Sequence, residues 1–305
     1  MIAVIYYAYG APKSVDNVED YFTHILKGKK VPEPMLANIV GMFKKSGYPD
    51  FIRSSTERIA KGLTTLLNNG EEEVKVYVAY KHTAPFVEDV YQEIVEAGAT
   101  TIVTMPVNPI LSATGGGAVH TEVAELVKDT TIQHIAINHF NTAPEIVEVF
   151  ADRVSRAFNW LSADARENAE VLFTVHSQPL DPERNEPYVK QFEELAAAVA
   201  AKAGIEKFAA VYRSGKPAGW LAPDVKDVMR EHAANGVKGF VTCELLSVTA
   251  DVESFVETNV ECQEVAKEIG VEHAVSEFLG DSFDTVVALS EIIKKHIQAA
   301  TTVQA

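Results

Sequence analysis

Cysteine is scarce in this chain of 305 residues, which contains only Cys243 and Cys262. Two cysteines provide no disulfide framework and no CxxC metal pair, and they exclude a four-cysteine iron–sulfur cluster within a single chain. Their scarcity favours a cytoplasmic protein, because disulfides accumulate in oxidising compartments. Long apolar runs are also missing. None reaches the ~18 residues that a membrane-spanning helix needs, so we expect no integral membrane segment.

Positive charge is the second shortage. Lys and Arg number 27 against 43 Asp and Glu, and the formal net charge is −16. This balance argues against nucleic acid as a partner, because that binding depends on neutralising phosphates. Most of the negative charge aids solubility. The negative electrostatic field of the protein also attracts metal cations, so a site for an anionic ligand needs positively charged side chains nearby.

Strand-like and helix-like segments alternate along the chain. Strands are expected at 1–8, 74–80, 101–107, 132–138, 171–175, 208–212 and 239–243, and helices at 56–67, 86–97 and 186–203. This βαβα order predicts an α/β fold with parallel sheets covered by helices. We expect two doubly wound, Rossmann-like domains, residues 1–150 and 151–305, whose sheets face a central cleft.

One histidine occupies a position that is typical of functional sites. The apolar run Val171–Phe173 leads into Thr174-Val175-His176-Ser177-Gln178-Pro179. In open α/β sheets, ligands bind outside the carboxyl ends of the strands, where His176 is expected. A hydrogen-bonded structural histidine at a strand–loop junction explains this segment equally well, so His176 alone leaves the function open.

Three glutamates follow the expected strand at 239–243. Glu253, Glu257 and Glu261 are spaced i, i+4, i+8 and share one face of a helix. A solvated surface tolerates such a row. Alternatively the row handles a cation, because carboxylates bind hard divalent ions. Glu253 and His176 are expected in the same crevice, where a histidine opposite a carboxylate suits proton abstraction or metal handling.

Three further segments carry aromatic or basic residues. Segment 8–12 ends the first strand and places Tyr9 at the carboxyl edge of the sheet. Segment 21–30 mixes aromatics with lysines, which can hold a flat, carboxylated ligand by stacking and charge. Segment 219–224 places Trp220 just before an expected helix. Each also has a structural interpretation: a strand-end tyrosine, a solvated basic face and a packing tryptophan.

Together these segments resemble the ferrochelatase family, the enzymes that insert ferrous iron into a porphyrin. The resemblance covers nearly the whole chain, and its parts come in the family's order. They are AYGAP (8–12), YFTHI (21–25), KHTAPFVED (81–89), VHSQP (175–179), WLAPDV (220–225) and ADVESFVETNVEC (250–262).

The resemblance implies a catalytic pair. His176 matches the family's invariant histidine at the metal-insertion site, and Glu253 matches the carboxylate that faces it. Glu257 and Glu261 match the acidic row behind them, which the family often places on a π-helical turn. His176, Glu253, Glu257 and Glu261 are therefore the expected metal-handling residues.

The resemblance also implies porphyrin contacts. Tyr9 matches a tyrosine on the opposite porphyrin face, Trp220 a cleft-lining tryptophan, and Lys81 and His82 a lysine–histidine pair near the cleft. The expected substrate-binding residues are Tyr9, Tyr21, Lys27, Lys29, Arg53 and Trp220, with Lys30 and Arg213 as further contacts for ligand carboxylates.

Some segments depart from the family pattern. Leu26 and Lys27 replace a basic pair, Met42 replaces an arginine that supports an outer metal site, and 46–51 replaces a GGxSPL segment. The segment 106–110 replaces a PHFS-like one. These departures concern the outer metal site and the contacts to propionates, and they leave His176 and Glu253 intact.

The expected function is a cytoplasmic, monomeric ferrochelatase of haem biosynthesis. Its substrates are Fe²⁺ and coproporphyrin III or protoporphyrin IX, and it requires no cofactor. One alternative is a tetrapyrrole- or metal-binding paralogue without turnover, and another is a chelatase for a different metal or macrocycle. A nucleotide-dependent enzyme is a third, although Gly115-Gly116-Gly117 belongs to neither a GxGxxG motif nor a P-loop.

Overall fold

The chain folds into two compact units, and its last helix returns to the first of them. The computed structural model describes residues 1–47, 51–68, 72–112, 115–215 and 218–304. Unit 1 comprises Met1–Phe140 with Gly280–Ala305, and unit 2 comprises Asn141–Leu279. This division differs from the expected domains 1–150 and 151–305. Helix α12 (Phe283–Gln304) packs against α3 (Phe51–Leu67), close enough that a Cβ on Gly62 would lie 2.9 Å from Val286 Cγ1.

Unit 1 contains a four-stranded parallel sheet in the order β2-β1-β3-β4. Its strands are β1 (Ile2–Ala8), β2 (Val74–Tyr80), β3 (Thr101–Pro106) and β4 (Gln133–Ala136). Every residue of β1 is buried, as is usual for a central parallel strand that helices cover on both faces. From β1 the chain adds β2 on one side and then β3 and β4 on the other, so the direction in which strands are added changes between β1 and β3. Such a switch point opens a ligand crevice at the carboxyl ends of the strands.

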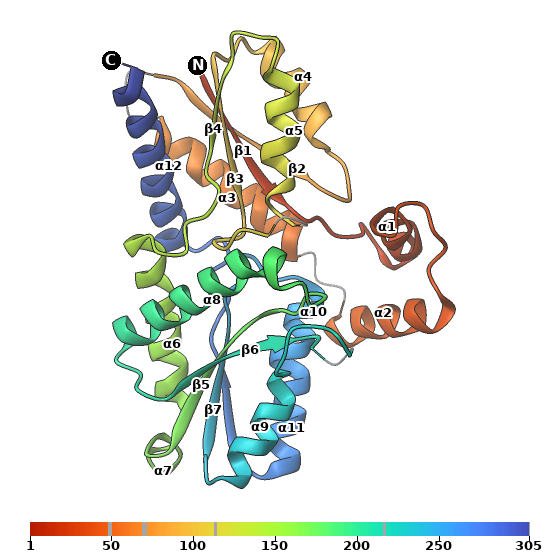
Figure 1. Cartoon of the computed structure of the whole chain (residues 1–305), viewed down its shortest axis with the longest axis vertical. Helices are drawn as coiled ribbons and strands as arrows, with labels where there is room; N and C mark the ends of the chain where they lie inside the picture. Colours follow the sequence, from red (N-terminus) through yellow and green to blue (C-terminus); the bar gives the residue numbers. More distant parts are fainter. Residues whose placement is uncertain (48–50, 69–71, 113–114, 216–217, 305) are drawn as a thin grey trace. The chain divides into compact units, whose positions relative to one another are not determined.

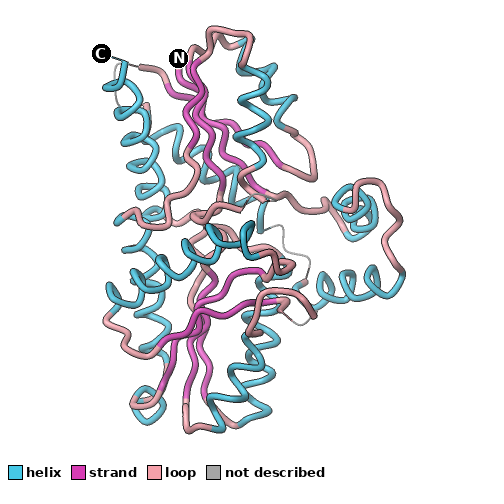
Figure 2. The backbone as a smooth tube through the Cα atoms, viewed as in Figure 1, coloured by secondary structure: helices cyan, strands magenta, loops and turns pink. Residues whose placement is uncertain are grey.

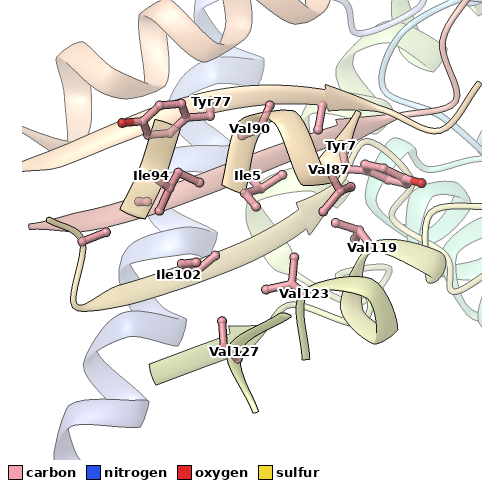
Figure 3. Packing of buried hydrophobic residues seen from close by; sticks show 13 residues of the cluster. Ile5, Tyr7, Tyr77, Val87, Val90, Ile94, Ile102, Val119, Val123 and Val127 are labelled. Atoms are coloured by element: carbon pink, nitrogen blue, oxygen red, sulfur yellow. The ribbon is translucent and has the colours of Figure 1, made fainter. Parts of the chain in front are cut away.

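Helices α4 (Val87–Glu96) and α5 (Ala118–Val127) cover one face of the unit 1 sheet, and α3 and α12 cover the other (Figure 1). The unit also contains the short 3₁₀ helix η1 (Val15–Asn17), α1 (Val18–Ile25) and α2 (Glu33–Ser46), where α1 contacts both η1 and α2. Alternate residues of β1, such as Ile5 and Tyr7, pack against Val90 of α4 and Val123 of α5 (Figure 3). Helices α3 and α12 contact the sheet as well.

A buried polar relay joins three elements of unit 1. The Thr104 hydroxyl lies 2.7 Å from His120 Nδ1 and 2.8 Å from His134 Nε2. The hydroxyl has one proton, so it donates to one imidazole and accepts from the other. Burial, together with the nearby His134, lowers the pKa of His120 to about 4. His120 is therefore neutral in the folded protein at neutral pH.

Mild acid is expected to weaken unit 1 through this relay. The folded pKa of His120 is depressed, so the unfolded chain takes up the proton first, and stability is lost as the pH falls below about 6.5. Between about pH 7 and about pH 5.5 this loss amounts to about 1 kcal/mol. Urea unfolding should show a smaller acid loss for His120→Asn than for the native chain. Equal losses in the two proteins would contradict the prediction.

Unit 2 repeats the same sheet order with β6-β5-β7-β8, again parallel throughout. Its strands are β5 (Ala169–His176), β6 (Phe208–Arg213), β7 (Gly239–Glu244) and β8 (Glu272–Val275). The switch point lies between β5 and β7. The strands β5, β6 and β7 end in His176, Arg213 and Glu244, so three ionisable side chains meet at one edge of the sheet.

The helices of unit 2 also form two layers, as the tube in Figure 2 shows. They are α6 (Pro144–Trp160), α7 (Ala163–Arg166), α8 (Pro182–Ala203), α9 (Val225–Ala234), α10 (Val252–Phe255), the π-helical turn η2 (Val256–Glu261) and α11 (Cys262–Ile269). Helices α9 and α11 pack on Leu172 and Phe240 through Met229 and Val265. Helices α6 and α8 contact each other and the strands.

The expected α/β fold with two parallel sheets is confirmed. All seven expected strands are present, with ends that agree within two residues, and β8 is the strand that the sequence analysis missed. It is a four-residue edge strand whose partly exposed sequence EHAV carries little apolar signal. Among the described helices, none combines the length and apolar character needed to cross a membrane.

Candidate active site

His176 is held at the carboxyl end of β5 by bonds to its backbone and to its ring. The Tyr188 hydroxyl donates to the His176 carbonyl at 2.8 Å, and the Ser177 amide donates to the Arg213 carbonyl at 2.8 Å. The ring Nδ1 bonds to the Ser177 carbonyl oxygen. A carbonyl only accepts, so Nδ1 carries the hydrogen and Nε2 is the atom available for chemistry.

Glu253 faces that nitrogen from the first turn of α10. The distance from His176 Nε2 to Glu253 Oε2 is 3.3 Å, and the two side chains remain 29% and 46% exposed. Asp251 caps this helix by accepting from the Ser254 amide at 2.7 Å, which fixes where the helix begins. The expected convergence of the His176 and Glu253 side chains is therefore observed.

The pKa values of the pair shift in opposite directions. Burial opposes ionisation of Glu253, but the hydrogen bond and charge of His176, with the charge of Arg213, lower its pKa to about 2. Burial and Arg213 act to lower the pKa of His176, and the bond to Glu253 outweighs them and raises it. The two groups therefore form an ion pair that shares one proton between Nε2 and Oε2.

Arg213 is buried among carboxylates of its own chain, which argues against the expected contact with a ligand carboxylate. Its side chain is 3% exposed, and its guanidinium already faces carboxylates of its own chain. The distances are 3.0 Å to Glu244, 3.6 Å to Asp251, 3.7 Å to Glu253 and 3.5 Å to Glu257. The sequence shows the charge of Arg213 but not the partners that surround it after folding.

The acidic row lies partly on the π-helical turn that the family resemblance implied. In a regular α-helix the side chains of residues i and i+8 point about 80° apart around the axis. The wider turn of η2 reduces this angle between Glu253 and Glu261. Glu257 accepts from the Ser214 hydroxyl at 2.8 Å, and Glu261 pairs with Lys226 at 2.5 Å. The row is therefore neutralised by neighbouring donors and cations and is not a solvated surface stripe.

Metal handling by His176, Glu253, Glu257 and Glu261 stays a prediction. In the part of the chain that the structure describes, no group of three or more His, Cys, Asp or Glu side chains is arranged to hold a metal ion. His176 and Glu253 provide two convergent donor atoms, a nitrogen and an oxygen. Such a pair suits an ion that other ligands complete.

Trp220 lies beside His176, and its contact with a porphyrin stays a prediction. The ring centroids are 6.3 Å apart. Trp220 forms a β-bridge with Pro179, the Leu221 amide donates to the Gln178 carbonyl at 2.9 Å, and the Ser177 hydroxyl donates to the Leu221 carbonyl at 2.6 Å. These bonds tie the loop after β5 to the loop before α9, so the backbone that carries Trp220 has a fixed position.

In unit 1, Tyr9 is part of an aromatic and basic cluster at the carboxyl end of β1. Tyr9 is 41% exposed, and its ring meets the His82 ring edge-on at a centroid distance of 4.5 Å. Lys81 Nζ lies 5.7 Å from the Tyr9 centroid. Burial chiefly, together with the charge of Lys27, lowers the pKa of Lys81 against the opposing effect of Glu122.

Tyr21 and His24 of α1 extend this cluster. The Tyr21 hydroxyl donates to the Gly10 carbonyl at 2.8 Å, and His24 Nδ1 lies 2.9 Å from His82 Nδ1. Gly10 has φ +93°, and a Cβ there would lie 2.7 Å from the Thr83 methyl group, so this turn requires glycine. Burial, with the charges of Lys81 and His24, lowers the pKa of His82 to about 4.

The predicted basic contacts lie in unit 1 in different settings. Lys27 and Lys29 are exposed just after α1, and Lys27 adopts a left-handed backbone conformation with φ 56°. The Arg53 guanidinium lies 5.4 Å from the ring centroid of Tyr80, at the end of β2. Their contacts with a ligand stay a prediction. Part of the departing segment 46–51, residues 48–50, lies outside the described residues.

The glycine run before α5 is needed for packing. A Cβ on Gly116 would lie 2.5 Å from Pro106 Cβ and 2.9 Å from Asn108 Oδ1. This close approach to the end of β3 accounts for a small residue at this position without a phosphate ligand.

Sequence reasoning missed Glu244, which is central to the electrostatics of unit 2. Its side chain is 3% exposed and accepts from the Thr174 hydroxyl at 2.8 Å, from Arg213 Nε at 3.0 Å and from the Leu246 amide at 3.1 Å. A charged residue that ends the apolar run Gly239–Cys243 was the available signal. Buried charges of this kind require partners, and those partners cluster near functional sites.

Comparison with known sequences matches nearly the whole chain to one family. The family model described as Ferrochelatase covers residues 1–297. Coproporphyrin III ferrochelatase 2 of Bacillus cereus is 28% identical, with 97% of this chain and 95% of that protein covered. Coproporphyrin III ferrochelatase of Bacillus subtilis is 30% identical, with 95% and 96% covered.

Solved structures of similar fold are chelatases. SirB from Bacillus subtilis with Fe³⁺ matches with a TM-score of 0.63 and 13% identity, covering 97% of this chain and 95% of that one. The sirohydrochlorin chelatase SirB from Bacillus subtilis subspecies spizizenii in complex with cobalt matches with a TM-score of 0.58, also at 13% identity, covering 97% and 94%. At such identities the likeness shows the fold alone.

Proposed function

We propose that this chain, which belongs to the ferrochelatase family, inserts Fe²⁺ into coproporphyrin III. The chain is a ferrochelatase, a metal chelatase that inserts iron into a porphyrin in haem biosynthesis. The choice of coproporphyrin III over protoporphyrin IX is the finer proposal. It is supported by the names of two relatives that align with the chain over almost its entire length.

The convergence of His176 and Glu253 carries the mechanism. A free-base porphyrin keeps two protons on its pyrrole nitrogens, and both must leave before a metal can take their place. His176 Nε2 and Glu253 Oε2 lie 3.3 Å apart, close enough to share a proton. We propose that arriving Fe²⁺ displaces this proton to solvent and that, when the ion passes to the porphyrin nitrogens, His176 Nε2 accepts one pyrrole proton while the second leaves to solvent.

The neighbours of the pair keep it ready for this exchange. The bond from His176 Nδ1 to the Ser177 carbonyl fixes the ring so that Nε2 points at the carboxylate. The hydrogen bond and charge of His176, with the charge of Arg213, lower the pKa of Glu253 to about 2, so the carboxylate meets the incoming cation with a negative charge at neutral pH. The pair therefore combines an anion with an imidazole that accepts a proton once the shared one has left.

Glu257 and Glu261 are proposed to continue the path of the metal. They follow Glu253 along η2, and each already has a cationic partner, Arg213 for Glu257 and Lys226 for Glu261. A carboxylate with a cationic partner attracts a dication less strongly than an isolated one. An ion can therefore pass along the row without being trapped at one step.

Unit 1 is proposed to supply porphyrin contacts. The exposed ring of Tyr9 offers an aromatic face, and Lys81 offers a cation beside it. Lys27 and Lys29 are exposed in a chain of net charge −16 and supply the local positive charge that porphyrin carboxylates need. We also propose that the chain works in the cytoplasm, where Cys243 and Cys262 remain the buried free thiols seen here.

Steady-state insertion under anaerobic conditions tests the proposed substrate. Purified protein with Fe²⁺ is expected to turn over coproporphyrin III with a kcat/KM at least about tenfold above that for protoporphyrin IX, since a tenfold preference needs only about 1.4 kcal/mol of extra binding to carboxylates. Zn²⁺ serves as a parallel metal. A preference for protoporphyrin IX would overturn the substrate. Binding without turnover, or turnover only with another metal or macrocycle, would overturn the iron-insertion function.

A further inference from the structure

Arg213 is a positively charged side chain inside a site that is proposed to bind a metal cation. It ends β6 directly beside His176 in the parallel register, and its side chain is 3% exposed. Its Nη1 atom lies 3.7 Å from Glu253 and 3.5 Å from Glu257, the first two carboxylates of the acidic row. Guanidinium stays protonated in proteins, so this positive charge is permanent.

Two other carboxylates hold Arg213 from its remaining edges. Nε lies 3.0 Å from Glu244 and Nη2 lies 3.6 Å from Asp251. Glu244 is in turn fixed by the Thr174 hydroxyl and the Leu246 amide. All three guanidinium nitrogens therefore face carboxylates, and these contacts hold the side chain in place when a metal ion approaches.

The residue after Arg213 adds a constraint on the same carboxylates. Ser214 has φ 57°, a left-handed conformation that is unfavourable for serine, and its hydroxyl donates to both oxygens of Glu257 at 2.8 and 2.9 Å. The end of β6 therefore directs both a cation and a hydroxyl at the second carboxylate of the row.

We propose that Arg213 is a positioning residue that keeps the metal at His176 and Glu253 weakly bound, so that the ion passes to the porphyrin. This inference rests on the proposed function. Glu244, Asp251, Glu253 and Glu257 are four oxygen donors of the type that forms tight cages for divalent ions. With Arg213 among them, these carboxylates are oriented toward a guanidinium, and a dication at the His176–Glu253 pair meets a like charge nearby.

The arrangement of the described side chains agrees with this role. Four carboxylates surround one guanidinium, yet no three ligating side chains among the described residues are arranged to hold an ion. A site meant to retain a metal would converge its carboxylates on an empty centre. Here they converge on a protein cation, which lowers affinity at this site while preserving the negative face that attracts Fe²⁺.

Two single variants separate this role from a structural one. Arg213→Gln removes the cation, and Glu244→Gln removes the opposite partner of the same buried ion pair. Breaking a buried pair is destabilising in either case. The proposal predicts opposite effects on metal affinity. Arg213→Gln should bind Zn²⁺ about tenfold more tightly than the native chain, and Glu244→Gln should bind it more weakly.

The measurement is calorimetric titration of the full chain with Zn²⁺ in the absence of porphyrin, followed by steady-state kinetics with Fe²⁺ and coproporphyrin III. For Arg213→Gln we expect the KM for metal and kcat to fall together, because the ion binds more tightly and leaves more slowly. Unchanged or weaker Zn²⁺ binding by Arg213→Gln would overturn the inference. So would a raised KM for metal.

A double variant and one control complete the test. Arg213→Gln with Glu244→Gln removes the least exposed of the four carboxylates that would otherwise lose their cation, so it should fold even if the Arg213 variant does not. It should bind Zn²⁺ more tightly than Glu244→Gln alone, and equal affinity would overturn the inference. His176→Ala reports on the proposed function itself. If it binds Zn²⁺ as the native chain does, the proposed metal site fails, whatever Arg213 does.

Discussion

Replacement of His176 by alanine is expected to lower kcat for iron insertion by ~10²–10⁴-fold, the range typical for loss of a positioned general base. The variant removes Nε2, which faces Glu253 Oε2 at 3.3 Å. The fold should survive, because the backbone bonds from Tyr188 and through Ser177 do not involve the imidazole. Anaerobic turnover of Fe²⁺ with coproporphyrin III, alongside thermal unfolding, measures both effects.

His232→Ala is the matched control for that variant. His232 also pairs with a glutamate, at 2.6 Å from Glu170, but the pair lies at the amino end of β5, whereas His176 ends the same strand. This control should keep native kcat. Near-native turnover by His176→Ala, or an equal loss in both histidine variants, would remove His176 from the chemistry.

Glu253→Gln is expected to lower kcat by roughly 10²-fold or more. The amide keeps the shape of the side chain but has no charge with which to hold Fe²⁺. It also removes the main group that raises the pKa of His176, while burial and Arg213 continue to lower it. Zn²⁺ titration should therefore show weaker binding in the same variant in which iron insertion is slowed.

Glu268→Gln is the control for Glu253→Gln, because it removes one glutamate at a position away from His176. Glu268 lies on α11, just beyond the acidic row, and makes an exposed ion pair with Arg230 at 2.9 Å. Exposed pairs of this kind contribute little, so activity and stability should remain native. If Glu253→Gln behaves like Glu268→Gln, then Glu253 carries surface charge only.

The strands that form the two sheets could be predicted because they are long and apolar. β1, with the sequence IAVIYYA, is buried along its whole length, and such runs are characteristic of central parallel strands. β8 lacked that signal, because its four residues are only half buried at the edge of the sheet. The return of α12 to unit 1 had no sequence signal either, since an amphipathic helix does not indicate which sheet it covers.

The meeting of His176 and Glu253 could be predicted from topology together with the family resemblance. Parallel strands present their carboxyl ends at one edge, so the residues that follow β5 and β7 were expected in one crevice. Glu257 and Glu261 lie on the π-helical turn that the resemblance implied, and their metal handling stays a prediction. Their partners, Arg213 and Lys226, were not foreseen, because no local pattern pairs residues that lie so far apart in the chain.

By itself the sequence determined the order of strands and helices, the edge at which the strands end and the residue types that meet there. These are local properties, set by apolar periodicity and by where each run stops. Only the tertiary structure decided which charged side chains are buried next to one another. Arg213 meets Glu244 and Glu257 across 31 and 44 residues of chain. Whether a charge binds a ligand or an internal partner depends on that packing, because burial strengthens each attraction and makes an unpaired charge costly.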